Sequence, residues 1–123
     1  MEEKTALIVD DEVDIRQHLS SMLSSSGFKV IVAEDGLGAI KLAKENNPDI
    51  IILDVNLPDI DGGEVASRLS QDAQTSAIPI VYLTGLITKE EKKEPGKIGK
   101  NFVIAKPILK GELLSIISKV LIR

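Results

Sequence analysis

The stretch IIILDVNLPDIDGG, residues 50–63, changes character at Asp54. Its first four residues are branched and apolar without alternation, which is typical of a strand covered on both faces of a parallel sheet. The residues after Asp54 include Pro58, Gly62 and Gly63, which are typical of a turn. The stretch therefore predicts a buried strand that ends on a carboxylate.

Four more apolar runs of this kind recur along the chain, at residues 6–9, 30–33, 80–83 and 102–105. Between the runs lie segments with helical spacing, which parallel neighbours need as crossover connections. The last segment has the clearest apolar face, at Leu113, Ile116, Ile117, Val120 and Leu121. This order predicts a doubly wound α/β domain, with a five-stranded parallel sheet and helices on both faces.

The fourth crossover is the weakest helix of the pattern. Thr88 and Glu91 have the spacing of a capping box. Pro95, Gly96 and Gly99 follow, and a proline inside a helix costs about 3 kcal/mol while each glycine costs roughly 1 kcal/mol. We expect this helix to be short, broken or mobile.

The composition of the chain limits the classes of protein to which it can belong. At 123 residues, with 43% hydrophobic and 28% charged residues, the chain fits one folded domain with a core. The absence of cysteine excludes disulfides and thiol chemistry, and the net charge of -4 argues against a general affinity for nucleic acids. The acidic start is unlike a signal peptide, and no apolar run approaches the roughly 20 residues of a membrane span. We therefore expect a cytoplasmic protein without membrane insertion.

The residues at the ends of the predicted strands are the main functional signal. Asp10 and Asp11 follow the first strand, Asp54 and Thr84 follow the third and fourth apolar runs, and Lys106 follows the fifth. Because parallel strands point the same way, we expect these side chains to meet at one edge of the sheet, where ligands of such sheets bind. Each residue alone is more typical of a turn, a helix cap or a solvated surface, whereas the five together favour a site.

Phosphate chemistry with Mg²⁺ is the reaction that these residue types predict. Three close carboxylates repel one another unless one takes up a proton or a cation lies among them. Mg²⁺ prefers oxygen ligands and leaves positions open for water and phosphate. Thr84 and Lys106 can donate to a phosphoryl group, and Asp54 can act as a covalent nucleophile.

Four motifs carry a resemblance to a known family: LIVDDE at residues 7–12, ILDVNLPDIDG at 52–62, LTG at 83–85 and AKP at 105–107. Over essentially its whole length the chain resembles the receiver domains of two-component response regulators, of which the chemotaxis regulator is the compact example. The resemblance implies a flavodoxin-like strand order, 2-1-3-4-5. It also implies a single receiver domain over residues 1–123, with no output domain, that acts as a phosphorylation-dependent signalling switch.

The resemblance implies a role for each residue around the metal. Asp54 would be the phosphoacceptor and a Mg²⁺ ligand, and Asp11 would be a direct ligand. Asp10 would act mostly through metal-bound water, and Asn56 would give its backbone carbonyl to the metal.

The resemblance also implies how the phosphoryl group is held and where it comes from. Thr84 would donate to the group, Lys106 would pair with it, and the bond from Lys106 to Pro107 would be cis. The donor would be a phosphohistidine on a sensor histidine kinase or a histidine phosphotransfer protein. The chain would catalyse its own phosphorylation and a slow dephosphorylation, rather than act as an enzyme on a separate substrate, and a downstream protein would read its changed surface.

Two features depart from the family pattern. The family usually carries Tyr or Phe three residues before the lysine, where this chain has Val103. Phe102 is one residue earlier and, by alternation along a strand, is expected on the other face. The second departure is the fourth helix, interrupted at Pro95 and Gly96, which belongs to the usual partner surface of the family.

Two alternative functions remain open from the sequence. A hydrolase of the haloacid dehalogenase type also forms an aspartyl phosphate, but it needs a second acid where this chain has Asn56. A degenerate receiver would act only as a phosphorylation-independent protein-interaction module, which Val103 and the interrupted fourth helix favour.

Overall fold

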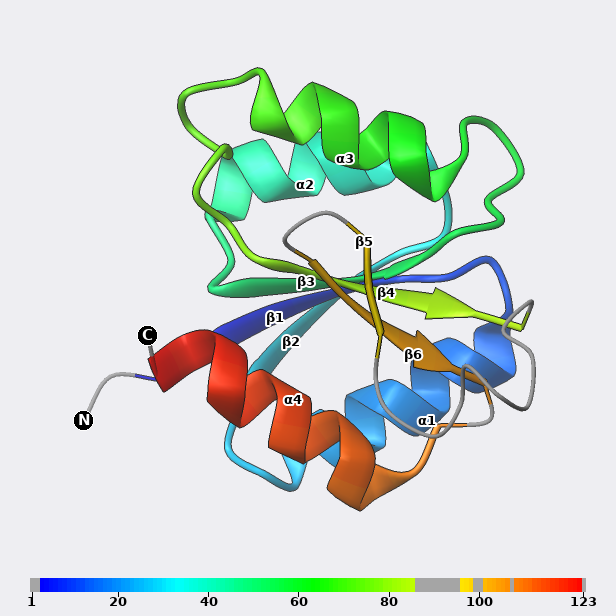
Figure 1. Ribbon diagram of the computed structural model, residues 1–123, viewed down its shortest axis with the longest axis vertical. Helices are drawn as coiled ribbons and strands as arrows, with labels where there is room; N and C mark the ends of the chain where they lie inside the picture. Colours follow the sequence, from blue (N-terminus) through cyan, green and yellow to red (C-terminus); the bar gives the residue numbers. More distant parts are fainter. Residues whose placement is uncertain (1–2, 86–95, 99–100, 107, 123) are drawn as a thin grey trace.

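The computed structural model describes residues 3–85, 96–98, 101–106 and 108–122. In this part of the chain, a central sheet lies between two pairs of helices (Figure 1). The helices are α1 (Val13–Ser24), α2 (Gly36–Asn46), α3 (Gly62–Ser70) and α4 (Lys110–Ile122). The strands are β1 (Thr5–Val9), β2 (Lys29–Ala33), β3 (Ile50–Asp54), β4 (Ile80–Thr84), β5 (Gly96–Ile98) and β6 (Asn101–Ala105).

The sheet has the strand order β2-β1-β3-β4-β6-β5. The first five strands in this order are all parallel, which confirms the predicted doubly wound sheet and its 2-1-3-4-5 order. Every residue of β3 is buried, as the unbroken apolar run at residues 50–53 predicts for a central strand. The short strand β5 pairs antiparallel with β6 at the edge of the sheet and was not predicted.

The fourth helix was expected to be short, broken or mobile near Pro95 and Gly96, and residues 96–98 form the strand β5 rather than the continuation of a helix. Gly96 is paired with Val103 in the antiparallel ladder, and a glycine has a low helix propensity. The rest of that predicted helix, including Pro95 and Gly99, lies outside the described residues.

Alternation along the strands divides the core into two clusters, one on each face of the sheet. Odd and even residues of β1 belong to different clusters: Ile8 packs with α1 and α4, and Leu7 packs with α2 and α3. Val103 and Phe102 also belong to different clusters, which agrees with the expectation that they point to opposite faces. Tyr82 lies beside Val103 in the ladder between β4 and β6, and its ring is buried in the cluster with α2 and α3.

The carboxyl ends of four strands lie next to one another in the ladder. Val9 is paired with Leu53, Asp54 with Leu83, and Thr84 with Ala105. The residues that end or follow β1, β3, β4 and β6 therefore reach the same edge of the sheet, and this edge holds the candidate site.

Candidate functional site

The carboxyl edge of the sheet contains a cavity of about 370 Å³, which we call the carboxylate cleft. Its lining residues are Asp11, Glu12, Asp54, Asn56, Gly85 and Lys106. Asp10, fully buried, lies directly beside the cleft, because its carboxylate is 2.9 Å from the ammonium of Lys106. Three segments far apart in sequence thus bring acids and one lysine together.

The turn after β1 is held by hydrogen bonds to Asp10. The Asp10 side chain accepts a bond from the backbone N–H of Glu12 at 2.9 Å, which closes the turn. Its backbone carbonyl accepts a bond at 2.8 Å from the guanidinium of Arg16 on α1. Since Asp10 has no exposed surface, its position is set by the protein rather than by solvent.

Asp54 is the last residue of β3, and only 3% of its surface is exposed. The backbone N–H of Asn56 donates to the Asp54 carboxylate at 3.2 Å. Burial raises the pKa of this carboxyl, the charge of Asp10 adds to the effect, and the hydrogen bond from Asn56 and the nearby Lys106 oppose it. Asp54 is therefore a carboxylate that water solvates poorly and that a cation would stabilise.

The loop that follows Asp54 is packed tightly against α2 and α3. A Cβ added at Gly62 would lie 2.7 Å from the backbone oxygen of Asp54, so only glycine fits there. The carboxylate of Asp59 accepts bonds from the N–H groups of Gly36 and Leu37, at 2.8 and 2.9 Å. These bonds lower the pKa of Asp59 to about 2 and tie the loop to the start of α2.

Lys106 is the cation of the cleft. Its Nζ lies 2.9 Å from Asp10, 3.1 Å from Glu12 and 3.5 Å from Asp54. Burial alone would lower the pKa of Lys106, but the close contact with Asp10, the hydrogen bond to Glu12 and the charges of Asp10 and Asp54 raise it to about 12. The side chain is therefore charged at neutral pH.

The residues of the cleft fit a hard divalent cation. The oxygens of Asp10, Asp11 and Glu12 lie within 4.8 Å of one another, and all the donors are oxygen. Oδ2 of Asp10 is buried and accepts no hydrogen bond of good geometry in the described part of the chain, although Lys106 is close. The Lys106 ammonium offsets part of the cost of burying this charge, and a bound divalent cation would offset more of it.

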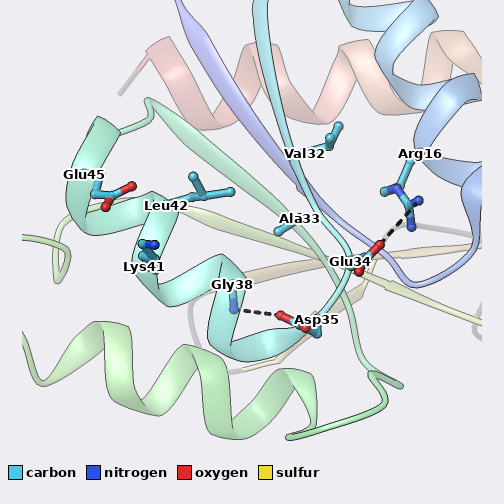
Figure 2. A pocket seen from close by; sticks show the side chains of 9 residues that line it. All are labelled: Arg16, Val32, Ala33, Glu34, Asp35, Gly38, Lys41, Leu42 and Glu45. Atoms are coloured by element: carbon cyan, nitrogen blue, oxygen red, sulfur yellow. Dashed lines mark hydrogen bonds and ion pairs between the residues drawn. The ribbon is translucent and has the colours of Figure 1, made fainter.

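A second hollow of about 420 Å³, the β2–α2 pocket, lies between β2 and α2 (Figure 2). Its lining residues are Arg16, Val32, Ala33, Glu34, Asp35, Gly38, Lys41, Leu42 and Glu45. Asp35 caps α2 by accepting a bond from the N–H of Gly38 at 2.7 Å. Arg16 lies 4.0 Å from Glu34, whose side chain is 75% exposed. The charges of this pocket are thus tied to local partners or face water.

A family model described as response regulator receiver domain matches residues 6–118. The chain belongs to the response regulator receiver family. Among curated proteins, this receiver is 33% identical to protein PilH of Pseudomonas aeruginosa, over 94% of its own length and 95% of PilH. It spans about half the length of several other curated relatives, 52% and 50% in two of them.

Solved structures of receiver domains have the same fold. Chemotaxis response regulator CheY4 of Vibrio cholerae is 33% identical, with a TM-score of 0.84 over 97% of this chain and 99% of CheY4. The receiver domain of sensor histidine kinase PA1611 from Pseudomonas aeruginosa is 26% identical, with a TM-score of 0.85 over 98% of both chains. That structure contains a magnesium ion coordinated in the active site cleft.

As a receiver domain, the protein is a phosphorylation-dependent signalling switch and not a classical enzyme. Receiver domains bind Mg²⁺ in the active site, and they interact with histidine kinases and downstream effectors.

The receiver brings together most of the residues that the sequence singles out. Asp11, Asp54, Asn56 and Lys106 line the cleft, and Asp10 contacts Lys106. Thr84 is buried at the end of β4, where its backbone oxygen accepts a bond from the N–H of Lys106 at 2.9 Å, while Gly85 lines the cleft beside it. The predicted cis bond involves Pro107, which lies outside the described residues.

Glu12 is a charged residue of the cleft for which the sequence pattern predicted no role. It stands in the LIVDDE motif as a third consecutive acid, but an acid after a metal-binding pair is also typical of the start of a helix. Its contact with Lys106 joins residues 94 positions apart, which only the fold reveals. Glu12 therefore belongs in any account of the site.

Proposed function

We propose that Asp54 is the phosphoacceptor of this receiver and that it takes a phosphoryl group from a phosphohistidine on a sensor histidine kinase or a histidine phosphotransfer protein. The observation that carries the proposal is the position of Asp54, an almost buried carboxylate at the end of β3 with the ammonium of Lys106 at 3.5 Å. Buried carboxylates beside a fixed cation are suited to nucleophilic attack on phosphorus.

In the transfer, an oxygen of Asp54 forms a bond to phosphorus while the bond from phosphorus to the donor imidazole breaks. The electron pair of that bond stays on the imidazole nitrogen, which then takes a proton. Lys106 is placed to donate to the phosphoryl oxygens as charge moves onto the acceptor, and it needs no large movement because it already contacts Asp54. The hydroxyl of Thr84, at the end of the adjacent strand, is the proposed second donor.

Asp10, Asp11 and Asp54, together with the backbone carbonyl of Asn56, are the residues proposed to hold Mg²⁺. The fit rests on the carboxylate oxygens of Asp10 and Asp11, which lie within 4.8 Å of each other, and on Asp54 and Asn56, which line the same cleft. The ion would supply positive charge that offsets the negative charge of the phosphoryl group and of the crowded carboxylates.

We further propose that the receiver catalyses its own phosphorylation and a slow hydrolysis of the product, and that a downstream protein reads the change of surface. The phosphoryl group carries about -1.5 to -2 charges in place of the single charge of the Asp54 carboxylate, and its pairing with Lys106 shifts the population between two conformations. The cytoplasmic location and the lack of direct nucleic-acid binding remain predictions. Among the helices that the structure describes, none has both the length and the apolar character of a membrane span.

The test is incubation of the purified protein with acetyl phosphate and Mg²⁺, followed by intact mass measurement. We expect one phosphoryl group on the wild type and none on Asp54→Ala. Glu45→Gln, which removes an acid from the β2–α2 pocket, is the matched control and should be phosphorylated like the wild type. An adduct that survives Asp54→Ala, or no adduct on the wild type, would contradict the proposal.

A further inference from the structure

Glu12 and Asp10 are the two carboxylates closest to Lys106, and neither is the proposed nucleophile. The Lys106 ammonium is 2.9 Å from Asp10 and 3.1 Å from Glu12, but 3.5 Å from Asp54. An ammonium has three donors on a flexible stem, so a new acceptor on Asp54 must compete with the two acids that already hold it. How readily each of these two acids gives up Lys106 therefore affects the rate of phosphorylation of Asp54.

The two acids differ in what release would cost. Asp10 is fully buried, and leaving its charge without a partner in the protein interior is strongly unfavourable. The Glu12 side chain is 60% exposed, so water can replace the lysine at little cost. The backbone N–H of Glu12 is bonded to Asp10, which keeps the residue in place while its side chain moves. Glu12 is therefore the partner that Lys106 can exchange.

We propose that Glu12 is a positioning residue that holds Lys106 at the mouth of the carboxylate cleft and that a phosphoryl group on Asp54 displaces it. The inference rests on the proposed function of Asp54. The Glu12 carboxylate and the Lys106 ammonium carry opposite charges and lie 3.1 Å apart, so the contact between them is attractive. The Glu12 carboxylate thus competes with the phosphoryl group for one cation, and it slows phosphorylation and weakens binding of a phosphoryl analogue.

A metal ligand is the other role that the geometry offers Glu12, since its oxygen lies within 4.8 Å of oxygens of Asp10 and Asp11. The contact with Lys106 favours the first role, because Oε1 of Glu12 is 3.1 Å from the ammonium. A cation bound by the Glu12 carboxylate would compete with the lysine for that carboxylate. When the carboxylate is removed, the positioning role predicts a faster phosphorylation with a small loss of Mg²⁺ affinity, whereas the ligand role predicts a slower phosphorylation with a large loss of Mg²⁺ affinity.

The experiment compares the wild type with Glu12→Gln and Glu12→Asp, each with Lys106 intact and with Lys106→Met. Three quantities are measured at low salt: the rate of phosphorylation by acetyl phosphate, the affinity for beryllofluoride with saturating Mg²⁺, and the affinity for Mg²⁺ alone. In the phosphorylation step, acetate leaves with the electron pair of the broken bond to phosphorus. Chemical denaturation of each variant checks that it folds.

We expect Glu12→Gln to be phosphorylated about two- to fivefold faster and to bind beryllofluoride tighter by a similar factor, the range of an exposed ion pair. Glu12→Asp should gain as well, because its side chain is one methylene shorter and cannot reach Lys106. With Lys106→Met, Glu12→Gln should give no gain in beryllofluoride affinity. Mg²⁺ affinity should fall by less than about fivefold in either Glu12 variant.

Three outcomes would overturn the inference. The first is an equal rate of phosphorylation in the wild type and in Glu12→Gln. The second is a gain in beryllofluoride affinity from Glu12→Gln that is as large with Lys106→Met as with Lys106 intact. The third is a loss of Mg²⁺ affinity in the Glu12 variants larger than the expected limit, which would make Glu12 a metal ligand. All three presuppose a wild type that forms the adduct. A wild type that forms none would instead contradict the phosphoacceptor role of Asp54, so the two failures are distinguishable.

Discussion

The carboxylate cleft and the β2–α2 pocket are similar in volume, about 370 and 420 Å³, and both are lined by acids and a lysine. They differ in how the charges are held. In the cleft, Lys106 contacts three acids from two strand ends, and two of those acids, Asp10 and Asp54, are buried. In the pocket, Lys41 and Glu45 are exposed on one helix.

The difference in burial explains why the proposed chemistry is assigned to the cleft and not to the pocket. Exposed charges are screened by water, so moving one of them changes little. Buried carboxylates that share one cation interact strongly. A phosphoryl group or a metal ion at one of them therefore changes the interaction energies of the others. Matched substitutions in the two hollows test this comparison directly.

Loss of the lysine should have the largest effect. Lys106→Met is expected to slow phosphorylation by acetyl phosphate about 100-fold or more, because a donor to the developing charge is lost. Lys41→Met, the same change in the pocket, should leave the rate within about twofold. The measurement is the initial rate of adduct formation by intact mass, and equal effects of the two changes would remove the distinction between the hollows.

Mg²⁺ should stabilise the protein through the cleft alone. At a concentration 100 times its dissociation constant, a ligand of the native state adds about 2.7 kcal/mol to the free energy of unfolding. Asp11→Asn should abolish most of this gain, whereas Glu45→Gln should keep it. Urea denaturation with Mg²⁺ and with chelator gives the comparison, and an undiminished gain in Asp11→Asn would contradict the proposed ligand set.

Glycine-to-alanine changes compare the backbone around each hollow. The Cβ of Gly62→Ala would lie 2.7 Å from the backbone oxygen of Asp54, which cannot move away without disturbing β3, so we expect a loss of about 1–3 kcal/mol in the free energy of unfolding. The Cβ of Gly38→Ala would meet the Asp35 side chain, also at 2.7 Å, which can rotate. A gain in helix propensity should partly offset the weakened cap, leaving a change within about 1 kcal/mol. Urea denaturation that ranks Gly38→Ala as the more damaging change would contradict this reading.

Asp59 should give the smallest effect, visible as a dependence on pH. Asp59 lies in the loop that follows Asp54, but its carboxylate accepts hydrogen bonds from the start of α2, near the pocket. These bonds lower its pKa from the usual 3.8 to about 2. Its ionised form therefore stabilises the fold above about pH 4, and this contribution is lost as the pH falls toward 2. The difference in stability between the wild type and Asp59→Asn should be full at neutral pH and vanish near pH 2. Asp14→Asn, at an exposed acid of α1, is the control, and a difference that persists unchanged at pH 2 would contradict the assignment.

The parts of the fold and site that the sequence predicts share one physical origin. The apolar run before Asp54 identifies a doubly covered strand, and parallel strands bring their carboxyl ends to the same edge whatever the details of packing. The convergence of Asp10, Asp54 and Lys106 follows from that rule alone. Their individual functional roles remain predictions that the experiments above address.

Other features depend on side-chain reach or on weak local preference, which a pattern cannot resolve. Whether Glu12 points to solvent, a metal or Lys106 depends on torsion angles that follow from the whole turn after β1. The strand β5 is three residues long and pairs only with β6, so it leaves no periodicity to detect. The helix expected in the fourth crossover rested on a capping box, which indicates where a helix can begin and not that one forms.

The buried ring of Tyr82 has a practical consequence for all these measurements. The chain has one tyrosine and no tryptophan, so its intrinsic ultraviolet emission comes from a single aromatic group of known position. That group lies on β4, two residues before Thr84, and beside Val103 on β6, three residues before Lys106. We therefore expect binding in the cleft to change the emission of Tyr82 in the native sequence, without a dye or an engineered tryptophan.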